Sequence, residues 1–522
     1  MSLRLTYSTM FDPPPELHTR FEAAMERTLG ALGTYHPLHI AGEDRRGTQI
    51  LPKRNPADHQ QLLGEFAAGT SGDADEAVQA AQRAWRGWKQ TPWPHRVRLL
   101  RRVGQLLEER VFDIAVALTL EVGKNRMEAL GESQETADFF RVYCDDFERH
   151  NGFEQPLPDD PLVGEVSRNR SVMKPYGVWV VIAPFNFPLA LAGGPVAAPL
   201  VTGNTVVLKG ATATPWAGRL LADCVRDAGL PPGTFNYLSG SSGELGTALI
   251  DHPLIAGVTF TGSHDVGVQI ARRLHAGTCL RPCIAEMGGK NACIVTAAAD
   301  INRAATGIVR SAFGMGGQKC SALSRLYVQR ELADPLLDRV LQQITALRIG
   351  NPAQRESWLG PVTTQSAYES YARYAAQLRA GGARILRGGE HLRDGELARG
   401  FFVSPVVAEA PLDHPLWHTE MFLPILMLHR VSSKEEAMQL ANQSALGLTA
   451  GFYGAEEEIA WFHEHIEAGV TYANRPQGAT TGAWPGYQPF GGWKGSGNTG
   501  KGIASFYYLP QYLREQSQTV VE

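Results

Sequence analysis

The sequence predicts an α/β protein built around a mostly parallel sheet with helices on both faces. Between residues 177 and 289, short apolar runs such as VWVVI and TVVL alternate with segments of helical spacing. Strands that are buried on both faces are continuously apolar, and the helices between them supply the crossover connections. The pattern therefore predicts a Rossmann-type nucleotide-binding region, whose ligand lies at the carboxyl ends of the strands.

The elements before and within this region can be predicted in order. Residues 73–90 begin with acidic side chains and place apolar residues at helical spacing, so we expect an amphipathic helix there and more helix to about residue 150. Residues 151–176 are proline-rich and irregular. A helix is expected to begin at Pro215 and to end near Gly229, because proline suits the first turn of a helix and glycine its end.

A second α/β region is expected from about residue 291 into the 480s. The tail, ASFYYLPQYLREQSQTVVE, is too short to fold alone. We expect it to add a strand to another sheet, which could belong to a partner subunit. The predicted division is a Rossmann-like domain (1–153 and 177–289), a second α/β domain (290–490) and a small β flap (154–176 and 503–522). Because such a flap leaves an open edge, the chain is expected to be at least a dimer.

Composition narrows the class of protein. A chain of 522 residues suggests two or three domains, and 43% hydrophobic residues allow a sizeable core. The net charge is −4, and Lys and Arg form no run of five, so neither nucleic acid nor an acidic membrane is an expected partner. The sequence contains no apolar stretch of membrane-spanning length and no clear targeting segment at residues 1–15. A cytoplasmic enzyme is the expectation.

Neither a disulfide framework nor a metal site is expected. Six cysteines are too sparse for a framework of disulfides. Cys279 and Cys283 stand four residues apart without a second zinc-type pair, and His463 and His465 lack the spacing of a zinc helix.

Three residues stand in settings that suit carbonyl chemistry. Cys320 follows a glycine-rich turn next to Lys319, a cation that would lower the pKa of the thiol. Glu286 ends an apolar strand, where burial would raise its pKa and suit it to act as a general base. Asn186 lies at a strand end between two aromatics and could donate its amide to an oxyanion. Each residue alone has an ordinary structural alternative: a structural cysteine, a capping glutamate or a turn-forming asparagine.

Other segments suit a phosphate-bearing ligand. Lys209 ends an apolar run, residues 260–263 read FTGS, and Gly243 and Gly246 stand at a predicted helix start. The usual GxGxxG fingerprint is missing.

Taken together, these segments resemble the aldehyde dehydrogenase superfamily. Seven motifs occur in the order found in that family, and 34 residues separate Glu286 from Cys320, as they do there. The segments are Pro184–Pro188, Lys209, Phe260–Ser263, Glu286–Lys290, Gly317–Cys320, Glu420–Pro424 and Pro489–Gly492. The resemblance covers the chain from about residue 35. It implies the three-part fold described above, with residues 290–490 as the catalytic domain and the flap as an oligomerisation element.

The resemblance also implies a mechanism and a cofactor. Cys320 would attack the aldehyde, the Asn186 amide and the Cys320 backbone N–H would hold the oxyanion, and Glu286 would activate water to hydrolyse a thioester. The cofactor would be NAD, with NADP left open because Thr212 stands where the family commonly has a glutamate that repels a 2′-phosphate. The implied cofactor residues are Ile182, Pro184, Phe185, Lys209, Thr212, Gly243, Gly246, Phe260, Thr261, Gly262, Ser263, Gly267, Glu420 and Phe422.

Three local stretches resemble the 1-pyrroline-5-carboxylate dehydrogenase group: GQKCSALSRL, EVGKN with its following acidic residues, and TTGAWPGYQPFGG. The implied substrate is L-glutamate γ-semialdehyde, oxidised to L-glutamate in proline catabolism. The substrate-binding residues would be Glu135, Phe187, Ser321, Gly482, Ala483 and Phe490. The loop before Pro489 is longer than in that group, and Trp484 and Pro485 replace smaller or β-branched residues, which could narrow the site.

Several alternatives stay open at this stage. The chain could oxidise another small or medium aldehyde, or it could be a catalytically silent member of the family that acts as a binding protein. An enzyme that transfers the acyl group to coenzyme A is less consistent with Glu286, because a base serves hydrolysis by water. A hydroxyl dehydrogenase would be expected to carry GxGxxG or a Tyr-x-x-x-Lys pair, and neither occurs.

Overall fold

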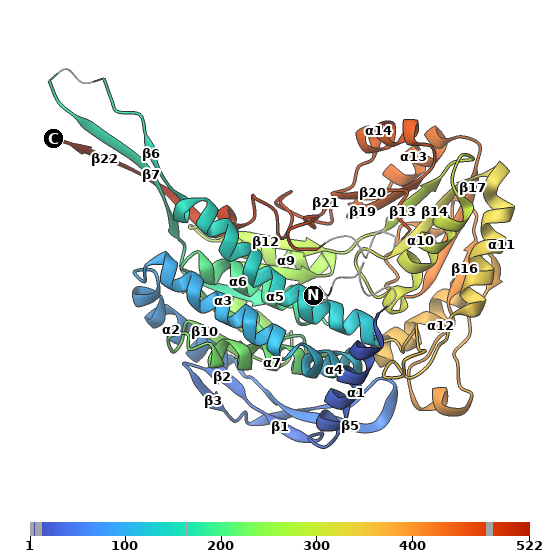
Figure 1. Cartoon of the computed structure of the whole chain (residues 1–522), viewed down its shortest axis with the longest axis horizontal. Coiled ribbons are helices and arrows are strands. Elements are labelled where there is room, and N and C mark those ends of the chain that lie inside the picture. Colours follow the sequence, from blue (N-terminus) through green and yellow to red (C-terminus); the bar gives the residue numbers. More distant parts are fainter. Residues whose placement is uncertain (1–4, 6–12, 162–163, 477–483) are drawn as a thin grey trace.

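The computed structural model describes residues 5, 13–161, 164–476 and 484–522. Two seven-stranded sheets dominate the described chain, and each is covered by helices (Figure 1). The first sheet consists, in spatial order, of β12 (Cys283–Met287), β11 (Ile255–Gly262), β8 (Val178–Ile182), β9 (Thr205–Lys209), β10 (Phe235–Leu238), β2 (Leu38–Ile40) and β3 (Glu43–Arg45). Strands β8 to β12 pair in parallel, which confirms the predicted α/β class.

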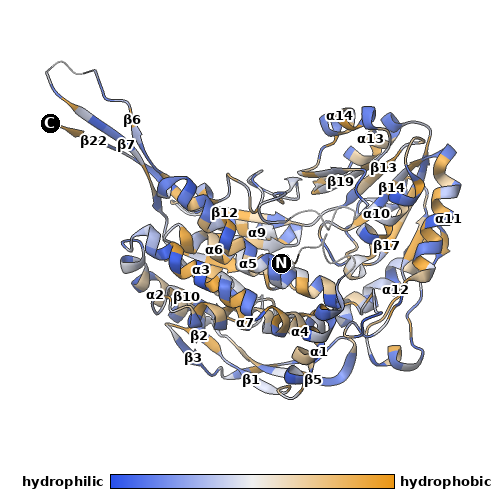
Figure 2. Cartoon of the chain, in the orientation of Figure 1, coloured by the Kyte–Doolittle hydropathy of each residue, from blue (hydrophilic) through white to orange (hydrophobic). Residues whose placement is uncertain are grey.

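Helices cover this first sheet, and several begin at residues with a clear capping function. Thr70 and Asp73 form a reciprocal capping box at the start of α2, and Pro215 opens α7 as predicted. The helix α6 is apolar along its whole length and is buried on almost every side (Figure 2). The helices are α1 (Pro15–Leu29), α2 (Ser71–Trp88), α3 (Trp93–Glu109), α4 (Val111–Val122), α5 (Arg126–Arg149), α6 (Ala190–Val201), α7 (Pro215–Asp227), α8 (Glu244–Asp251) and α9 (His264–Leu274).

The second sheet is also parallel except for its edge strand β15. Its strands, in spatial order, are β15 (Arg384–Arg387), β16 (Val406–Glu409), β17 (Ile425–Val431), β14 (Leu323–Gln329), β13 (Asn291–Val295), β19 (Thr449–Tyr453) and β20 (Val470–Ala473). Its helices are α10 (Ile301–Phe313), α11 (Arg330–Ala346), α12 (Gln365–Ala380), α13 (Lys434–Asn442) and α14 (Glu456–His465). A two-stranded ladder joins β18 (Leu446–Gly447) to β21 (Trp493–Lys494).

A three-stranded antiparallel sheet projects away from both larger bodies (Figure 1). It consists of β6 (Glu154–Leu157), β7 (Ser167–Pro175) and β22 (Leu513–Val521), and β22 pairs with β7 over all nine of its residues. The expected C-terminal strand is therefore present, and it pairs with β7 of the same chain. We propose that the cofactor domain, the catalytic domain and the flap follow these three sheets.

The N-terminal region contains strands that the sequence analysis did not predict. Besides β2 and β3, a small sheet contains β1 (Thr34–His36), β5 (Asp58–Ala68) and β4 (Gln49–Asn55). Strands β2 and β3 run antiparallel at the edge of the first sheet. These strands lie before residue 70, whereas the helices predicted between residue 73 and about residue 150 are present as α2 to α5.

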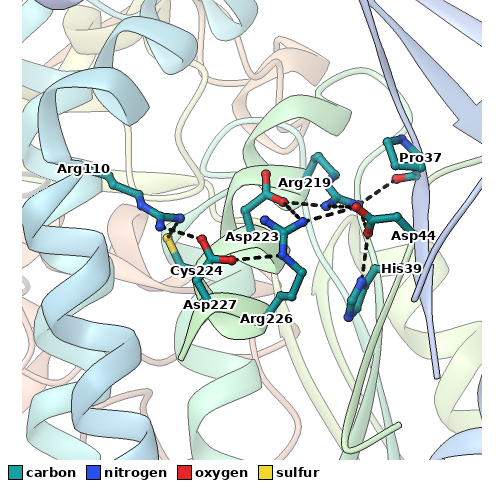
Figure 3. A network of polar contacts seen from close by, with 9 residues as sticks. All are labelled: Pro37, His39, Asp44, Arg110, Arg219, Asp223, Cys224, Arg226 and Asp227. Atoms are coloured by element: carbon teal, nitrogen blue, oxygen red, sulfur yellow. Dashed lines mark hydrogen bonds and ion pairs between the residues drawn. The ribbon is translucent and has the colours of Figure 1, made fainter. Parts of the chain in front are cut away.

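Arg219 connects α7 to the hairpin of β2 and β3 at the edge of the first sheet (Figure 3). The guanidinium of Arg219 is 3% exposed and donates to Asp44 Oδ1 at 2.8 Å, to the Pro37 carbonyl at 3.2 Å and also to Asp223. The exposed Arg226 contacts the same Asp44 and Asp223. Arg219 and Arg226 therefore share Asp44 and Asp223 as partners, and only Arg219 is buried.

Replacing Arg219 by alanine is expected to lower the free energy of unfolding by about 2–3 kcal/mol, because it removes the buried guanidinium that donates to Asp44, to Asp223 and to the Pro37 carbonyl. Arg226→Ala, the matched control, is expected to cost less than about 1 kcal/mol, because water screens its exposed ion pairs. Thermal and urea unfolding of both variants would measure the difference. Equal losses would show that Arg219 does not hold the hairpin in place.

Candidate active site

A glycine-rich turn places Cys320 between the two large sheets. Met315, Gly316 and Gly317 all have positive φ angles, between 53° and 66°, just before the cysteine. A Cβ added to Gly317 would lie 2.3 Å from the Leu423 carbonyl oxygen, so glycine is required there for close backbone approach. Gln318 then fixes the loop, since its side chain donates to the Met315 carbonyl and accepts the Thr363 N–H.

Asn186 reaches this loop from the end of β8. Its side-chain Nδ2 donates to the Gln318 carbonyl at 3.0 Å, and the side chain is buried. The Asn186 amide therefore bonds to a residue that stands two positions before Cys320, although Asn186 and Cys320 lie 134 positions apart in the sequence.

Two half-buried carboxylates face the same region. Glu286, in β12, accepts the Gly492 N–H at 3.2 Å, and burial raises its pKa to about 8, the direction that the sequence analysis predicted. Glu420 accepts the Gly289 N–H at 2.9 Å, and burial raises its pKa to about 7. Neither carboxylate has a cation as a hydrogen-bond partner among the described residues.

The thiol of Cys320 differs from the prediction. Burial, followed by the negative charges of Glu420 and Glu286, raises its pKa to about 12. The prediction that Lys319 lowers this pKa is wrong, because the Lys319 ammonium turns away and lies 3.7 Å from Glu128 Oε1, in a different cavity. These surroundings therefore favour the protonated form of the thiol.

Cys320 lines two cavities. The larger, of about 340 Å³, also contains Asn186, Glu286 and Glu420. The smaller, of about 70 Å³, contains Ser321 and the first turn of α6. Leu191, Phe490 and Ile503 border both cavities together with the cysteine. A group bound in either cavity would thus meet the same sulfur atom.

The predicted cofactor residues fall into two groups. Those that line the large cavity are Pro184, Phe185, Thr261, Gly262, Ser263, Glu420 and Phe422. The rings of Phe185 and Phe422 meet edge to face at 5.7 Å between centroids, at one wall of the cavity.

The other predicted cofactor residues do not line that cavity. Ile182, Lys209 and Phe260 pair side by side in register at the strand ends, and Phe260 is buried directly beneath Gly262 and Gly267. Lys209 donates to Ser242 Oγ at 2.9 Å, and burial lowers its pKa to about 8. Thr212 donates to the Gly240 carbonyl. Gly243 and Gly246 lie at the start of α8, where an added Cβ would meet open space at Gly246 and only Ser241 Oγ, at 3.7 Å, at Gly243.

Four of the six predicted substrate residues line the small cavity: Glu135, Phe187, Ser321 and Phe490. Gly482 and Ala483 lie outside the described residues. Trp484 also lines this cavity, and its indole N–H donates to Asp138 Oδ2 at 2.7 Å, so the bulky loop residue noted in the sequence does border the site.

The sequence analysis missed several wall residues. Phe139, Ala190, Leu191, Gln488, Ile503 and Ala504 complete the lining of the small cavity. Phe139 follows Glu135 by one helical turn on α5, so helical spacing could have found it. The others depend on tertiary packing and carry no signal in the sequence.

The described residues contain no group of three or more His, Cys, Asp or Glu side chains that could hold a metal ion. The Nδ1 atoms of His463 and His465 instead contact Thr471 Oγ1 and the Trp461 carbonyl. Among the described helices, none combines the length and apolar character needed to cross a bilayer.

Comparison with known proteins agrees with this geometry. The model of the aldehyde dehydrogenase family matches residues 43–517, and the chain belongs to that family. The 1-pyrroline-5-carboxylate dehydrogenase of Geobacillus kaustophilus is 36% identical over 510 residues, which are 96% of each chain. The solved structure of the 1-pyrroline-5-carboxylate dehydrogenase from Thermus with bound NAD superposes with a TM-score of 0.92 at 33% identity, over 98% of this chain and 97% of that one. The betaine aldehyde dehydrogenase of Staphylococcus aureus gives a TM-score of 0.88 at 25% identity, over 94% of this chain and 95% of that one.

Proposed function

We propose that this enzyme oxidises L-glutamate γ-semialdehyde, the open form of 1-pyrroline-5-carboxylate, to L-glutamate with NAD as oxidant. The observation that carries the proposal is the position of Cys320, which lines both cavities and so can meet an aldehyde in one and a cofactor in the other. The names of the relatives support the choice of substrate.

In the proposed reaction, the Cys320 thiol loses its proton to solvent water, and the resulting thiolate attacks the aldehyde carbon, whose carbonyl π electrons move to the oxygen. The Asn186 amide and the Cys320 backbone N–H stabilise the oxyanion of the thiohemiacetal. NAD, when bound, accepts a hydride from that carbon, which leaves a thioester on the sulfur. Glu286 then removes a proton from water, the water oxygen attacks the thioester, and the carboxylate product leaves as the thiol is regenerated.

The smaller cavity supports a short substrate with a polar end. Phe187 and Phe490 would contact the aliphatic part, and the Ser321 hydroxyl would donate to the α-carboxylate. We propose that backbone N–H groups of Gly482 and Ala483 complete this carboxylate site, as a nest of amides can. Glu135 would lie near the reacting end of the substrate.

The substrate proposal is tested by comparing aldehydes. Purified enzyme would be assayed for reduced nicotinamide with glutamate γ-semialdehyde and with uncharged aldehydes of similar length. Ser321→Ala is expected to raise the KM for the semialdehyde roughly tenfold through loss of one hydrogen bond to a charged group, and to leave the uncharged aldehydes unchanged. Turnover of the uncharged aldehydes alone would reject this substrate while keeping the chemistry.

The large cavity and the strand ends beside it fit a dinucleotide. Lys209 and Thr212 would lie at the adenosine ribose, Ser263 and the glycines near α8 and α9 near the pyrophosphate, and Glu420 at the nicotinamide ribose. Gly246 borders open space at the start of α8, which allows close approach of a ligand to the backbone.

Thr212→Glu is expected to weaken use of NADP by at least about tenfold in kcat/KM and to affect NAD much less. The added carboxylate would repel a 2′-phosphate but could accept hydrogen bonds from ribose hydroxyls. Initial rates with both cofactors at a saturating aldehyde concentration would measure the ratio. A loss that is equal for both cofactors would place the adenosine ribose elsewhere.

We propose that the enzyme acts as a homo-oligomer in the cytoplasm. The three-stranded sheet of β22, β7 and β6 leaves strand edges unpaired within the chain, and so does the second sheet at β15 and β20. Unpaired strand edges favour pairing with another copy. Sedimentation of the purified protein would give the number of subunits.

A further inference from the structure

Two charged side chains lie fully buried beside the active site and have no part in the proposed chemistry. Lys124 stands just before α5 and Glu132 lies within it, and both side chains have zero exposure. The Lys124 ammonium donates to Glu132 Oε2 at 2.5 Å. Enclosing such a pair costs desolvation of both ions, and buried pairs of this kind are often no more stable than apolar replacements. Overall stability is therefore a weak reason for their presence.

The second oxygen of Glu132 holds the start of α6. Glu132 Oε1 accepts the backbone N–H groups of Leu189 at 2.9 Å and Ala190 at 3.1 Å. The residue at the N-cap of α6 supplies no side-chain cap, so a neighbouring helix provides the acceptor. Leu189 lies three residues after Asn186, and Ala190 lies three residues after Phe187. The two hydrogen bonds to Glu132 therefore hold the chain just beyond Asn186, the proposed oxyanion donor.

Lys124 holds the aromatic wall. Its ammonium lies 3.5 Å from the centroid of the Phe187 ring, the range in which a cation attracts the face of a ring. Phe187 lines the small cavity beside Cys320 and Ser321. Helices α5 and α6 approach closely here: a Cβ added to Gly193 of α6 would lie only 2.4 Å from Thr136 Cγ2 of α5. The pair and this close packing leave the Asn186–Ala190 segment little freedom to move.

The same region of α5 also contacts the cysteine loop. Glu128 lies 3.7 Å from the ammonium of Lys319, the residue before Cys320. The charges of Glu128 and Lys319 both act on the pKa of Lys124, which burial lowers and Glu132 raises. Charges of alternating sign thus run from the start of α6 to the loop of the nucleophile.

We propose that Lys124 and Glu132 are positioning residues that hold the Asn186 amide and the Phe187 ring in register with Cys320. This inference rests on the proposed function, because it assigns the pair to oxyanion stabilisation and substrate contact. It predicts that the two charges matter for the chemical step more than for folding.

The test is the double variant K124M/E132Q, which removes both charges and keeps the shape and an amide oxygen for the N–H groups of Leu189 and Ala190. We expect kcat for the aldehyde to fall on the order of 10- to 100-fold, because small displacements of a reacting geometry cost that much. The KM for NAD and the rate of Cys320 alkylation by iodoacetamide are expected to stay within about twofold of wild type, because neither needs the Asn186 amide. An unchanged kcat in the folded variant would overturn the proposal.

The chain offers a matched control in Glu121. This carboxylate is also fully buried and accepts two backbone N–H groups, of Trp216 and Ala217, at the start of α7, but it borders neither active-site cavity. Glu121→Gln is expected to lower Tm without lowering kcat. An equal loss of kcat in this control would mean that any buried carboxylate at a helix start has the same effect, which would contradict a specific role for Glu132.

A second variant covers the case in which the double variant does not fold. Lys124→Arg keeps the buried charge and shifts the cation relative to the ring, and it is expected to raise the KM for the aldehyde several-fold, an effect of about 1 kcal/mol. Wild-type kinetics in this variant would contradict the proposal. If wild-type enzyme does not oxidise the semialdehyde, the substrate proposal fails separately, and the same variants are compared on the aldehyde that it does oxidise.

Discussion

Replacing Cys320 by alanine is expected to lower kcat for aldehyde oxidation by at least about 10⁴-fold, because the covalent intermediate can no longer form. The remaining side chains of both cavities are unchanged, so NAD binding and Tm should stay close to wild type. Steady-state rates and the quenching of protein fluorescence by NAD would measure the two effects. Cys279→Ala, at an exposed cysteine, is the control and should keep full activity.

The raised pKa of the Cys320 thiol adds a pH dependence to this prediction. Because the pKa lies near 12, the thiolate fraction increases steadily as the pH rises through the neutral range. Alkylation of the free enzyme by iodoacetamide should therefore accelerate with pH without reaching a plateau below pH 9. A plateau near neutral pH would mean that a base or cation activates the thiol more strongly than the half-buried carboxylates allow.

Replacing Glu286 by glutamine is expected to slow turnover by about 10²- to 10⁴-fold, because water loses its general base. Glutamine has nearly the same shape and can still accept the Gly492 N–H, so the site should keep its geometry. Hydride transfer precedes the step that needs the base, and a first turnover should still produce about one equivalent of reduced cofactor per site. Rapid mixing would resolve this burst from the slow steady state.

The pH dependence of wild-type turnover provides an independent check on Glu286. Its carboxyl is the active base only when ionised, and burial raises its pKa from 4.5 to about 8. Turnover limited by hydrolysis should therefore rise as the pH increases through about 8, and this rise should be absent in Glu286→Gln. A rise centred near pH 4.5 would mean that Glu286 is well solvated in the working enzyme.

Several features of the fold and site follow from local sequence. The alternation of apolar runs and helices gave the parallel first sheet, and Pro215 marked the start of α7. The raised pKa of Glu286 followed from its place at the end of an apolar strand, because burial of a carboxylate has a predictable sign.

Other features depend on contacts that sequence position does not reveal. Lys319 adjoins Cys320 in the chain, but the turn through Gly317 directs its ammonium toward Glu128 and away from the thiol. The strands β4 and β5 contain many half-exposed polar residues and so lack the apolar runs that marked β8 and β9. The pairing of β22 with β7 joins segments more than 300 residues apart and could not be assigned to one chain from the sequence.

The most direct test of the account is the mass of the Glu286→Gln protein after mixing with NAD and glutamate γ-semialdehyde. The account predicts one acyl group per chain, located on the peptide that contains Cys320 and released by hydroxylamine, which cleaves thioesters. No adduct, or an adduct on another residue, would contradict a thioester mechanism at Cys320.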